Sequence, residues 1–320
     1  MAMLVEPETR MLRVDLAHAG SASAYRGPDF RKPFARHFVP GYSKGRKRIA
    51  DFPVFSGKYS TFAYLDEVAH AVDDLLAKVG VGDAAFFQSM RALFFHRPYR
   101  FMPLQAMGYL LVRGLARDQG RRPELVRLCG EAKVEVEDVL AETSRHPDLF
   151  GALQKEQEVI DPCPATGAVS RALRNTPAFA DLLASKMSLG GEVAAQFGNL
   201  YSAALPAWLA AGIEEAQQRK LAIANEPMVM VGYGSGDAAE AIPVSLVDGW
   251  EDTAQRICAA QALADPIDLT REQYEAMHDG EPDASPAYSP KREFRIRAVG
   301  TRHEREFQDL GVDYYEFIGP

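Results

Sequence analysis

The sequence contains few cysteines and no long apolar run. Its 320 residues include three cysteines, Cys129, Cys163 and Cys258, which are too few and too widely spaced for a disulfide framework or a CxxC metal site. No stretch of about 18 apolar residues is present that could span a bilayer. The first residues also lack the basic and then apolar pattern of a signal peptide. We therefore expect a cytoplasmic protein that binds neither membranes nor metals.

The chain also lacks an excess of positive charge. Its 44 acidic residues outnumber the 36 basic residues and give a net charge of -8. This balance argues against a nucleic-acid-binding protein that works through bulk charge. The basic run from Ser43 to Arg48, "SKGRKR", indicates a solvated loop or a local contact with phosphates. Charged residues at 25 % and hydrophobic residues at 47 % are typical of a globular protein.

The first 60 residues predict strands and then an extended loop. "MAMLVEPETRMLRVDLAHAG" reads as two strands that begin at the first methionine and are joined by a turn at Glu6-Pro7-Glu8. Because a two-stranded ribbon alone is only marginally stable in water, we expect this strand pair to complete a sheet formed by a partner. Residues 26–60 are rich in proline, glycine and basic residues. The chain therefore divides into a strand pair, residues 1–25, and a domain, residues 26–320.

Helical and strand patterns alternate along the rest of the chain, which predicts an α/β fold. Apolar residues at helical spacing favour helices at 61–79, 103–116 and 199–216, and residues 123–186 are mostly helical with a break at "DPCPATG". Shorter helices are expected at 254–263 and from Leu269. Strands are expected at 93–95, on both sides of a glycine turn between 228 and 247, at 294–299 and at 312–318.

The stretch "LFFHRPYRFMP" places His96 where a predicted strand ends. Leu93 to Phe95 form a short apolar run, and Pro103 can open the following helix. Ligands of α/β proteins commonly bind beyond the carboxyl ends of strands. Since a histidine titrates near neutral pH, His96 could act as a general acid or donate to an oxyanion. The alternative is that the imidazole only forms hydrogen bonds with backbone groups where the strand ends. The other six histidines lie in predicted loops or on polar helix faces.

Two further segments carry candidate polar groups. "GNLYSAALPAWLAAG" places Asn199 at a predicted helix start, where its amide is either a simple N-cap or a group that binds a carbonyl or an anion. "VGYGSGDA" fits neither the GxGxxG dinucleotide loop nor the GxSxG nucleophile elbow. It predicts a tight turn whose glycines bring Ser235 close to a ligand, or a purely structural hairpin.

The order of these segments resembles the C-terminal half of 3-hydroxy-3-methylglutaryl-CoA synthase, a member of the thiolase-fold superfamily. "DFRKPF", "FPVFSGKYS", "FFHRPY", "GNLYSAAL" and "GYGSGDAA" resemble five of the family's motifs in the same order, and "AMLVE" looks like the strand that ends its N-terminal half. The match runs from Ala2 to about Phe307, apart from residues 118–191, which we expect to be a helical insertion. The resemblance implies the C-terminal half of a thiolase-like fold, with a mixed sheet flanked by helices.

The resemblance also implies an acyltransferase that forms a carbon–carbon bond. In that family a cysteine is acetylated, a glutamate removes a proton from the acetyl methyl group, and the carbanion adds to the ketone of acetoacetyl-CoA before hydrolysis. The substrate is a thioester of coenzyme A or of an acyl carrier, and no cofactor is implied. Phe101 stands where the family usually has a lysine that contacts coenzyme A. The residues implied are His96, Asn199 and Ser235 as catalytic, and Tyr201, Arg100, Gly234 and Gly236 as substrate-binding.

The family's cysteine and glutamate motifs belong to its N-terminal half and do not occur in these 320 residues. Our first hypothesis is therefore a two-chain synthase, a hetero-oligomer in which a separate N-terminal-half chain supplies cysteine and glutamate and this chain supplies the β-ketoacyl pocket. The second is a non-catalytic scaffold or regulatory subunit that binds an acyl-CoA or an acyl carrier protein. The third is a truncated gene product without independent function.

Overall fold

A computed structural model describes residues 4–26, 30–31, 54–235, 237–279, 286 and 288–319 of the chain. Contacts divide the chain into two compact units. The first comprises Met1–Arg31 and Phe55–Ala264, and the second comprises Lys32–Val54 and Asp265–Pro320. Residues 1–25, which we predicted to form a separate strand pair, are assigned to the first of these units, and the domain boundary predicted after residue 25 stays a prediction.

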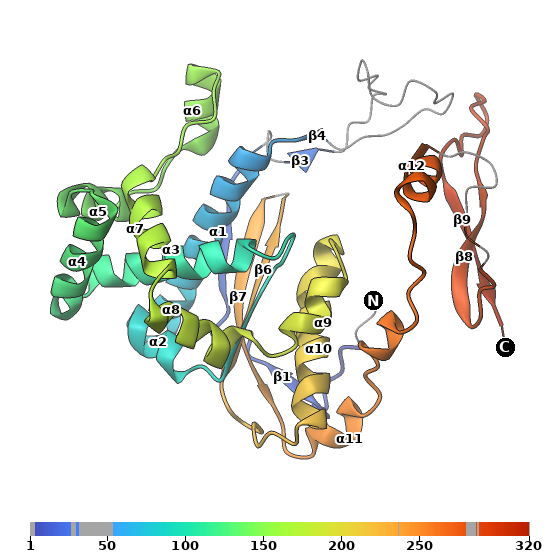
Figure 1. Ribbon diagram of the computed structural model, residues 1–320, viewed down its shortest axis with the longest axis horizontal. Helices are drawn as coiled ribbons and strands as arrows, with labels where there is room; N and C mark the ends of the chain where they lie inside the picture. Colours follow the sequence, from blue (N-terminus) through green and yellow to red (C-terminus); the bar gives the residue numbers. More distant parts are fainter. Residues whose placement is uncertain are drawn as a thin grey trace. The chain divides into compact units, whose positions relative to one another are not determined.

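A mixed sheet forms the centre of the first unit (Figure 1). Its order is β1-β7-β6-β5, with β2 also paired to β7. Strand β6 runs parallel to β5 and antiparallel to β7, and Phe95 of β5 is level with Val231 of β6. The strands are β1 (Leu12–Val14), β2 (Gly20–Ser23), β5 (Ala92–Phe95), β6 (Met228–Gly234) and β7 (Ala238–Leu246).

The N-terminal strands differ from our prediction. Leu4 and Val5, which precede the turn expected at residues 6–8, are not in a strand, and residues 1–3 lie outside the described residues. Strands β1 and β2 both follow this turn and both run antiparallel to β7 at successive positions. Gly20 brings β2 against helix α1 (Gly57–Val79), since a Cβ at this position would lie 2.1 Å from the carbonyl oxygen of Ala71. The strand pair is therefore part of this chain's own sheet, and its role in a partner's sheet stays a prediction.

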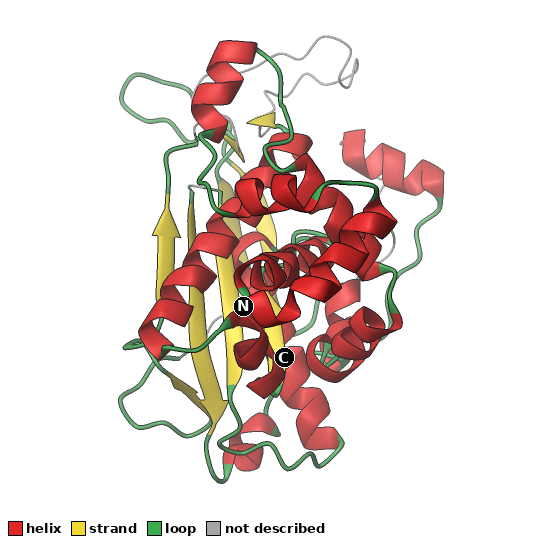
Figure 2. Ribbon diagram, turned by 90° about the vertical axis from the view of Figure 1, so that its left-hand side faces the viewer, coloured by secondary structure: helices red, strands yellow, loops and turns green. Residues whose placement is uncertain are grey.

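Helices cover both faces of the sheet. Side chains alternate between the faces of a strand, so neighbouring residues show which helix lies on which side. Tyr233 of β6 contacts Tyr64 of α1, whereas Gly232 approaches Leu205 of α10 (Ala204–Gln218). Helices α1 and α10 therefore lie on opposite faces, and Figure 2 shows the helical layer in front of the strands on the side of α1.

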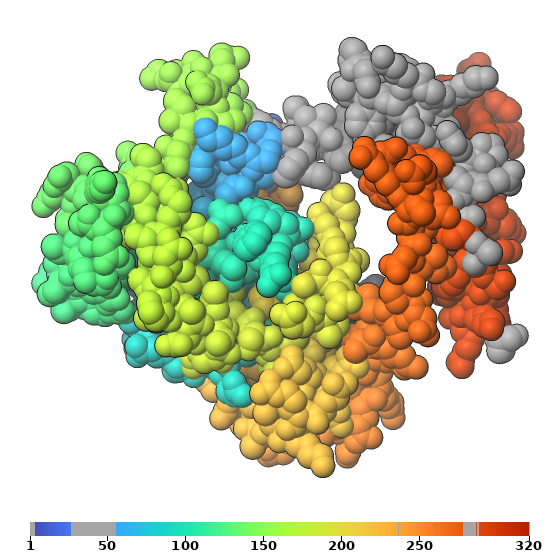
Figure 3. Space-filling view, viewed as in Figure 1, coloured from blue at the N-terminus to red at the C-terminus, as the bar shows by residue number. Residues whose placement is uncertain are grey.

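Residues 118–191, expected to be helical, form a series of short helices beside α3 (Met102–Arg117). Helix α7 contacts α3, α4 and α5, and Figure 3 shows this green and lime segment packed against the neighbouring helices. That it is an insertion stays a prediction. Its elements are η1 (Gln119–Arg121), α4 (Arg122–Ala132), α5 (Val136–Thr143), α6 (Leu149–Glu156), α7 (Pro164–Arg174), α8 (Pro177–Leu182) and η2 (Leu183–Met187).

The predicted helix at 103–116 is confirmed as α3, and the one at 61–79 is α1, which begins four residues earlier. The helix predicted from residue 199 begins as α10 at Ala204, after a 3-10 turn. The helix predicted at 254–263 is wrong, because α11 ends at Ala254. The remaining elements of the first unit are β3 (Phe30–Arg31), α2 (Asp83–Ser89), α9 (Gly191–Gln196), η3 (Tyr201–Ala203), α11 (Trp250–Ala254) and η4 (Gln261–Leu263). The two residues of β4 (Val54–Phe55) are divided between the two units.

The second unit contains helix α12 (Arg271–Asp279) and the antiparallel strands β8 (Glu293–Val299) and β9 (Asp313–Ile318). Thr270 caps α12, since its side-chain oxygen accepts a hydrogen bond from the Gln273 amide at 3.2 Å. Both strands and the helix agree with the sequence patterns. In the described ranges of the chain, no helix is both long enough and apolar enough to cross a membrane.

Candidate functional site

His96 lies directly after β5, where the chain leaves the sheet. Its amide donates a hydrogen bond of 2.7 Å to the Val231 carbonyl, which continues the pairing of β5 with β6 by one residue. Its carbonyl accepts a hydrogen bond of 3.0 Å from the hydroxyl of Tyr64. Backbone contacts therefore fix the position from which the imidazole projects.

Two tyrosines lie beside the imidazole of His96. The ring centroid of Tyr64 on α1 is 6.5 Å from that of His96, and the centroid of Tyr233 on β6 is 6.2 Å away. The two tyrosine rings also contact each other edge to face at 5.2 Å. The three rings thus come from three elements that are distant in sequence.

The surroundings of His96 favour its neutral form. His96 is buried, and burial lowers the pKa of its imidazole to about 4, because a charged ring would lose its hydration. At neutral pH the ring is uncharged and carries one N–H donor and one acceptor nitrogen. Such a ring can donate a hydrogen bond to a substrate oxygen without bringing a formal charge into the site.

Asn199 lies in the exposed segment before α10. Its side-chain oxygen accepts a hydrogen bond of 2.9 Å from the amide of Tyr201, so it supports the 3-10 turn and does not cap α10 directly. Tyr201 has a φ of +52°, a left-handed backbone conformation that is uncommon for a tyrosine, and its side chain is 60 % exposed. The segment therefore projects a polar amide and an aromatic ring outward.

Ser235 lies in the turn between β6 and β7, as the glycine pattern predicts. Gly234 is the last residue of β6, and Gly236 lies outside the described residues. The backbone of Gly234 does not have a positive φ. The carbonyl of Asp237 accepts hydrogen bonds from Ser23 and Ala24, and these contacts tie the turn to the end of β2.

The arginines after His96 have different surroundings. Arg97 donates to the Gly191 carbonyl at 3.1 Å and stacks over the ring of Trp208, so it joins the end of β5 to α9 and α10. Arg100, the predicted substrate-binding residue, is exposed. Phe101 is also exposed, at 57 %. Of the two arginines after His96, Arg100 is therefore the one whose side chain is exposed to solvent.

The three predicted catalytic residues lie at one end of the sheet, on three separate segments. Since β5 and β6 are parallel, His96 and Ser235 both follow carboxyl ends at the same edge. Helix α10 packs on β5 and β6 and precedes β6, so its N-terminus and Asn199 lie at this edge too (Figure 1). The hydrogen bonds of the described residues do not join His96 to Asn199 or Ser235.

Tyr64 and Tyr233 were not among the predicted site residues. Tyr64 lies on the buried face of α1, between the predicted apolar positions Phe62 and Leu65, and a tyrosine there carried no functional signal. Tyr233 stood inside the glycine motif and was considered only as a departure from GxSxG. Their roles follow from contacts between α1, β5 and β6 that the sequence pattern does not contain.

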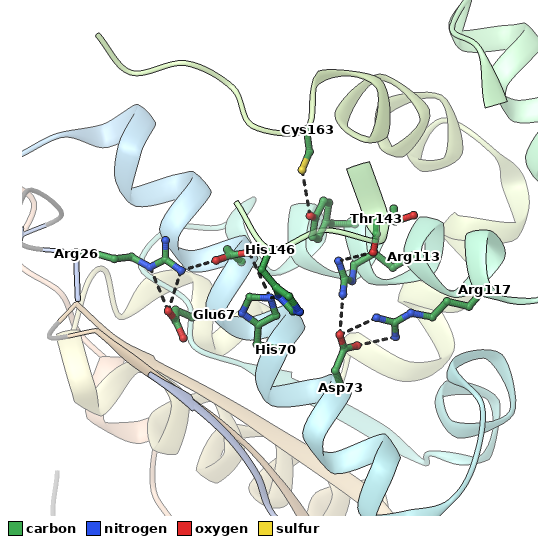
Figure 4. Close-up of polar contacts among 11 residues, drawn as sticks. Arg26, Glu67, His70, Asp73, Arg113, Arg117, Thr143, His146 and Cys163 are labelled. Atoms are coloured by element: carbon green, nitrogen blue, oxygen red, sulfur yellow. Dashed lines mark hydrogen bonds and ion pairs between the residues drawn. The ribbon is translucent and has the colours of Figure 1, made fainter. Parts of the chain in front are cut away.

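A second polar cluster lies along α1, α3 and the connection after α5 (Figure 4). Arg26 contacts Asp66 and Glu67, and Arg113 with Arg117 contacts Asp73. The imidazoles of His70 and His146 form a hydrogen bond. In the part of the chain that the structure describes, no group of three or more His, Cys, Asp or Glu side chains could hold a metal ion.

The mixed sheet with helices on both faces is a thiolase-like fold. Solved structures that share it are HMG-CoA synthases. MvaS in complex with 3-hydroxy-3-methylglutaryl coenzyme A has a TM-score of 0.60 at 17 % identity, with 97 % of this chain and 59 % of that chain covered. PksG, an HMG-CoA synthase from Bacillus subtilis, has a TM-score of 0.57 at 14 % identity, with 97 % and 58 % covered.

The HMG synthase of the curacin biosynthetic pathway, in complex with apo donor-ACP, has a TM-score of 0.57 at 16 % identity, with 97 % of this chain and 59 % of that chain covered. This chain therefore spans less than two thirds of the length of each of these structures. No known family model and no curated protein matches the sequence. At such identities the similarity establishes the fold alone.

Proposed function

We propose that this chain supplies the acceptor pocket of an HMG-CoA-synthase-like acyltransferase. The observation that carries the proposal is the neutral, buried His96 at the carboxyl end of β5. The pocket takes a β-ketoacyl thioester, and the ketone oxygen accepts the imidazole N–H. Asn199 and Ser235 line the same end of the sheet, with Tyr201, Arg100, Gly234 and Gly236 as contacts for the rest of the substrate.

The chemistry that this pocket serves is an addition to a ketone. The carbanion of an acetyl group forms a bond to the ketone carbon, and the electron pair of the C=O bond moves onto the oxygen. A positioned donor stabilises the alkoxide that develops, and removal of one such donor typically lowers the rate by about 10²–10³-fold. This role is supported by the backbone of His96, which is fixed by hydrogen bonds to Val231 and Tyr64.

In this proposal the acetyl-carrying cysteine and the glutamate base belong to a partner chain. Cys129 and Cys163 are buried, and burial raises the pKa of both thiols, which makes them poor nucleophiles. The MvaS structure contains 3-hydroxy-3-methylglutaryl coenzyme A, and the curacin synthase structures contain a donor-ACP. The acceptor thioester of this chain is accordingly one of coenzyme A or of an acyl carrier protein.

A binding experiment tests the acceptor pocket. Acetoacetyl-CoA and acetoacetyl-ACP are titrated separately into the chain by calorimetry, and we expect saturable binding of one of them. His96→Gln should weaken that binding, while His303→Gln, a control at an exposed histidine of the second unit, should not. Equal binding by wild type and His96→Gln would contradict the assignment of His96.

A reconstitution experiment tests the partner. The chain is co-expressed with an N-terminal-half chain that carries the cysteine and glutamate motifs, and the product is analysed by size exclusion and by a condensation assay. We expect a complex whose turnover falls about 10²-fold in His96→Gln. Failure of the two chains to associate would refute the two-chain enzyme. An active complex that tolerates His96→Ala would favour a non-catalytic scaffold or regulatory subunit.

A further inference from the structure

Tyr64 makes the contact that fixes His96 from the opposite layer of the fold. It lies on α1, is fully buried, and donates its hydroxyl to the carbonyl oxygen of His96 at 3.0 Å. Burial raises the pKa of the phenol above its ordinary value, and the charge of nearby Tyr99 acts in the same direction. The hydroxyl therefore stays protonated at all working pH values and remains a donor.

The carbonyl of His96 needs this donor. Strand β5 ends at Phe95, and the amide of His96 is the last group at that end to pair with β6. Beyond it the chain turns into Arg97 and Pro98, so the carbonyl leaves the sheet while the residue is still buried. A buried carbonyl without a partner costs free energy, and the Tyr64 hydroxyl supplies the partner from outside the sheet.

The ring of Tyr64 has a separate effect. Tyr64 and Tyr233 meet edge to face, with an interplanar angle of 74°, and both stand within 6.5 Å of the imidazole centroid. Together they replace water on that side of His96. Since burial is the cause of the low pKa of His96, loss of the ring would admit water and raise that pKa toward its ordinary value.

We propose that Tyr64 is a positioning residue for His96: its hydroxyl fixes the backbone where β5 ends, and its ring forms one wall of the imidazole's surroundings. The proposal rests on the proposed function of His96 as the donor to the substrate ketone. Tyr64 touches neither substrate nor reacting atoms in this scheme. It acts by fixing the position of the imidazole and by limiting the access of water to it.

Two variants separate the two contributions. Tyr64→Phe removes only the hydroxyl, and Tyr64→Leu removes the aromatic ring. Tyr109→Phe is the matched control, because Tyr109 is also a buried tyrosine of this core and its hydroxyl bonds to the Cys163 sulfur at 3.6 Å instead of to His96. All three variants keep an apolar side chain in the core.

The first measurement uses the chain alone. The imidazole of His96 is titrated by NMR, and its signal is assigned by its loss in His96→Gln. Tyr64→Phe should leave the His96 pKa within about one unit of the wild-type value, and Tyr64→Leu should raise it toward about 6.5. Hydrogen exchange of the His96 amide should become faster in Tyr64→Phe and stay unchanged in Tyr109→Phe.

The second measurement uses the reconstituted complex. Tyr64→Phe should lower kcat for condensation by about 10- to 100-fold, because a small displacement of a catalytic group has effects of this size. KM for the acceptor should change far less, since the substrate contacts remain. Tyr109→Phe should retain the wild-type kcat.

The outcomes distinguish this proposal from the proposed function. If Tyr64→Phe matches Tyr109→Phe in both amide exchange and kcat, the role of the hydroxyl is refuted. If the His96 pKa in Tyr64→Leu equals that of wild type, the role of the ring is refuted. If His96→Gln has no effect on condensation, the proposed function fails, while the titration and exchange data still decide whether Tyr64 controls His96. If Tyr64→Leu does not fold, Tyr64→Phe still decides the role of the hydroxyl, and Tyr64→Met replaces Tyr64→Leu in the test of the ring.

Discussion

Replacing Arg26 with leucine tests how a buried ion cluster holds the first strands against α1. The guanidinium of Arg26 donates to Glu67 at 2.9 and 3.1 Å and also to Asp66, and all three side chains are buried. Burial lowers the pKa of Arg26, but the two carboxylates outweigh this effect and leave it raised. β2 ends at Ser23, three residues before Arg26, so the cluster joins the segment after that strand to the helix.

The expected cost follows from what the variant leaves behind. Leucine fills part of the volume but leaves two buried carboxylates without their cation. Removal of one partner from a buried ion pair typically costs about 3–5 kcal/mol, because the remaining charge is uncompensated. We therefore expect Arg26→Leu to lower the free energy of unfolding of the first unit by about 3–5 kcal/mol at pH 7.5.

The loss should depend on pH. Burial raises the pKa of Glu67 above its ordinary value, although Arg26 opposes this shift. A carboxyl group whose pKa is higher in the folded state binds its proton more tightly there, so stability falls as pH rises through the interval between the two pKa values. Loss of Arg26 raises the folded-state pKa further and widens that interval. The cost of Arg26→Leu should therefore be smaller at pH 5 than at pH 7.5.

Urea unfolding monitored by tryptophan fluorescence measures this cost. Trp208 and Trp250 are the two tryptophans of the sequence, and both are buried in the first unit. Arg10→Ala is the control, because its ion pair with Glu6 is exposed and such pairs contribute at most about 1 kcal/mol. A loss for Arg26→Leu no larger than that of the control, or an equal loss at both pH values, would refute the reasoning.

Three further changes test separate contacts by the same unfolding assay. Gly20→Ala should lower the free energy of unfolding by about 1–3 kcal/mol, since the added Cβ would clash with backbone atoms of α1. An unchanged urea midpoint would contradict the close approach of β2 and α1. Burial lowers the pKa of the His70 imidazole, so the stability that the neutral ring contributes should be lost as pH falls below about 6.5. The free energy of unfolding of His70→Phe should therefore fall less between pH 7 and pH 5 than that of the wild type. Glu142→Gln should lower the free energy of unfolding by about 1.5–3 kcal/mol, because the carboxylate accepts hydrogen bonds from the Ala165 and Thr166 amides at 3.0 and 2.7 Å. An unchanged free energy would show that the start of α7 does not depend on this carboxylate.

The parts of the fold that the sequence predicted are those set by local pattern. Helix α3 combines a proline in its first turn with apolar residues at helical spacing, and it was predicted to within one residue at each end. Strand β5 is buried on both faces, so it reads as a continuous apolar run. The pairing of β1 and β2 with β7 could not be predicted, because it joins segments more than 200 residues apart in the sequence.

The same distinction applies to the candidate site. His96 stood out because a polar residue directly follows an apolar run, and the turn around Ser235 stood out because of its glycines. The partners of His96 did not, since Tyr64 comes 32 residues earlier on a helix whose pattern reads only as core. The helix start assigned to Asn199 was displaced because a 3-10 turn precedes α10, and periodicity does not separate such a turn from the helix.

The positions of the thiols support the proposal that His96 acts on the acceptor side of the reaction. Cys163 contacts Tyr109 of α3, and Cys129 is buried in α4, so neither thiol is free to carry an acyl group. Cys258 is exposed, but the amide of neighbouring Ala260 bonds to a glutamate in the C-terminal half of α10, away from the end of the sheet where His96 lies. A cysteine that carries the acetyl group to a ketone bound by His96 therefore has to come from residues other than these three. This requirement makes the reconstitution with a cysteine-bearing partner the decisive test of the proposed function.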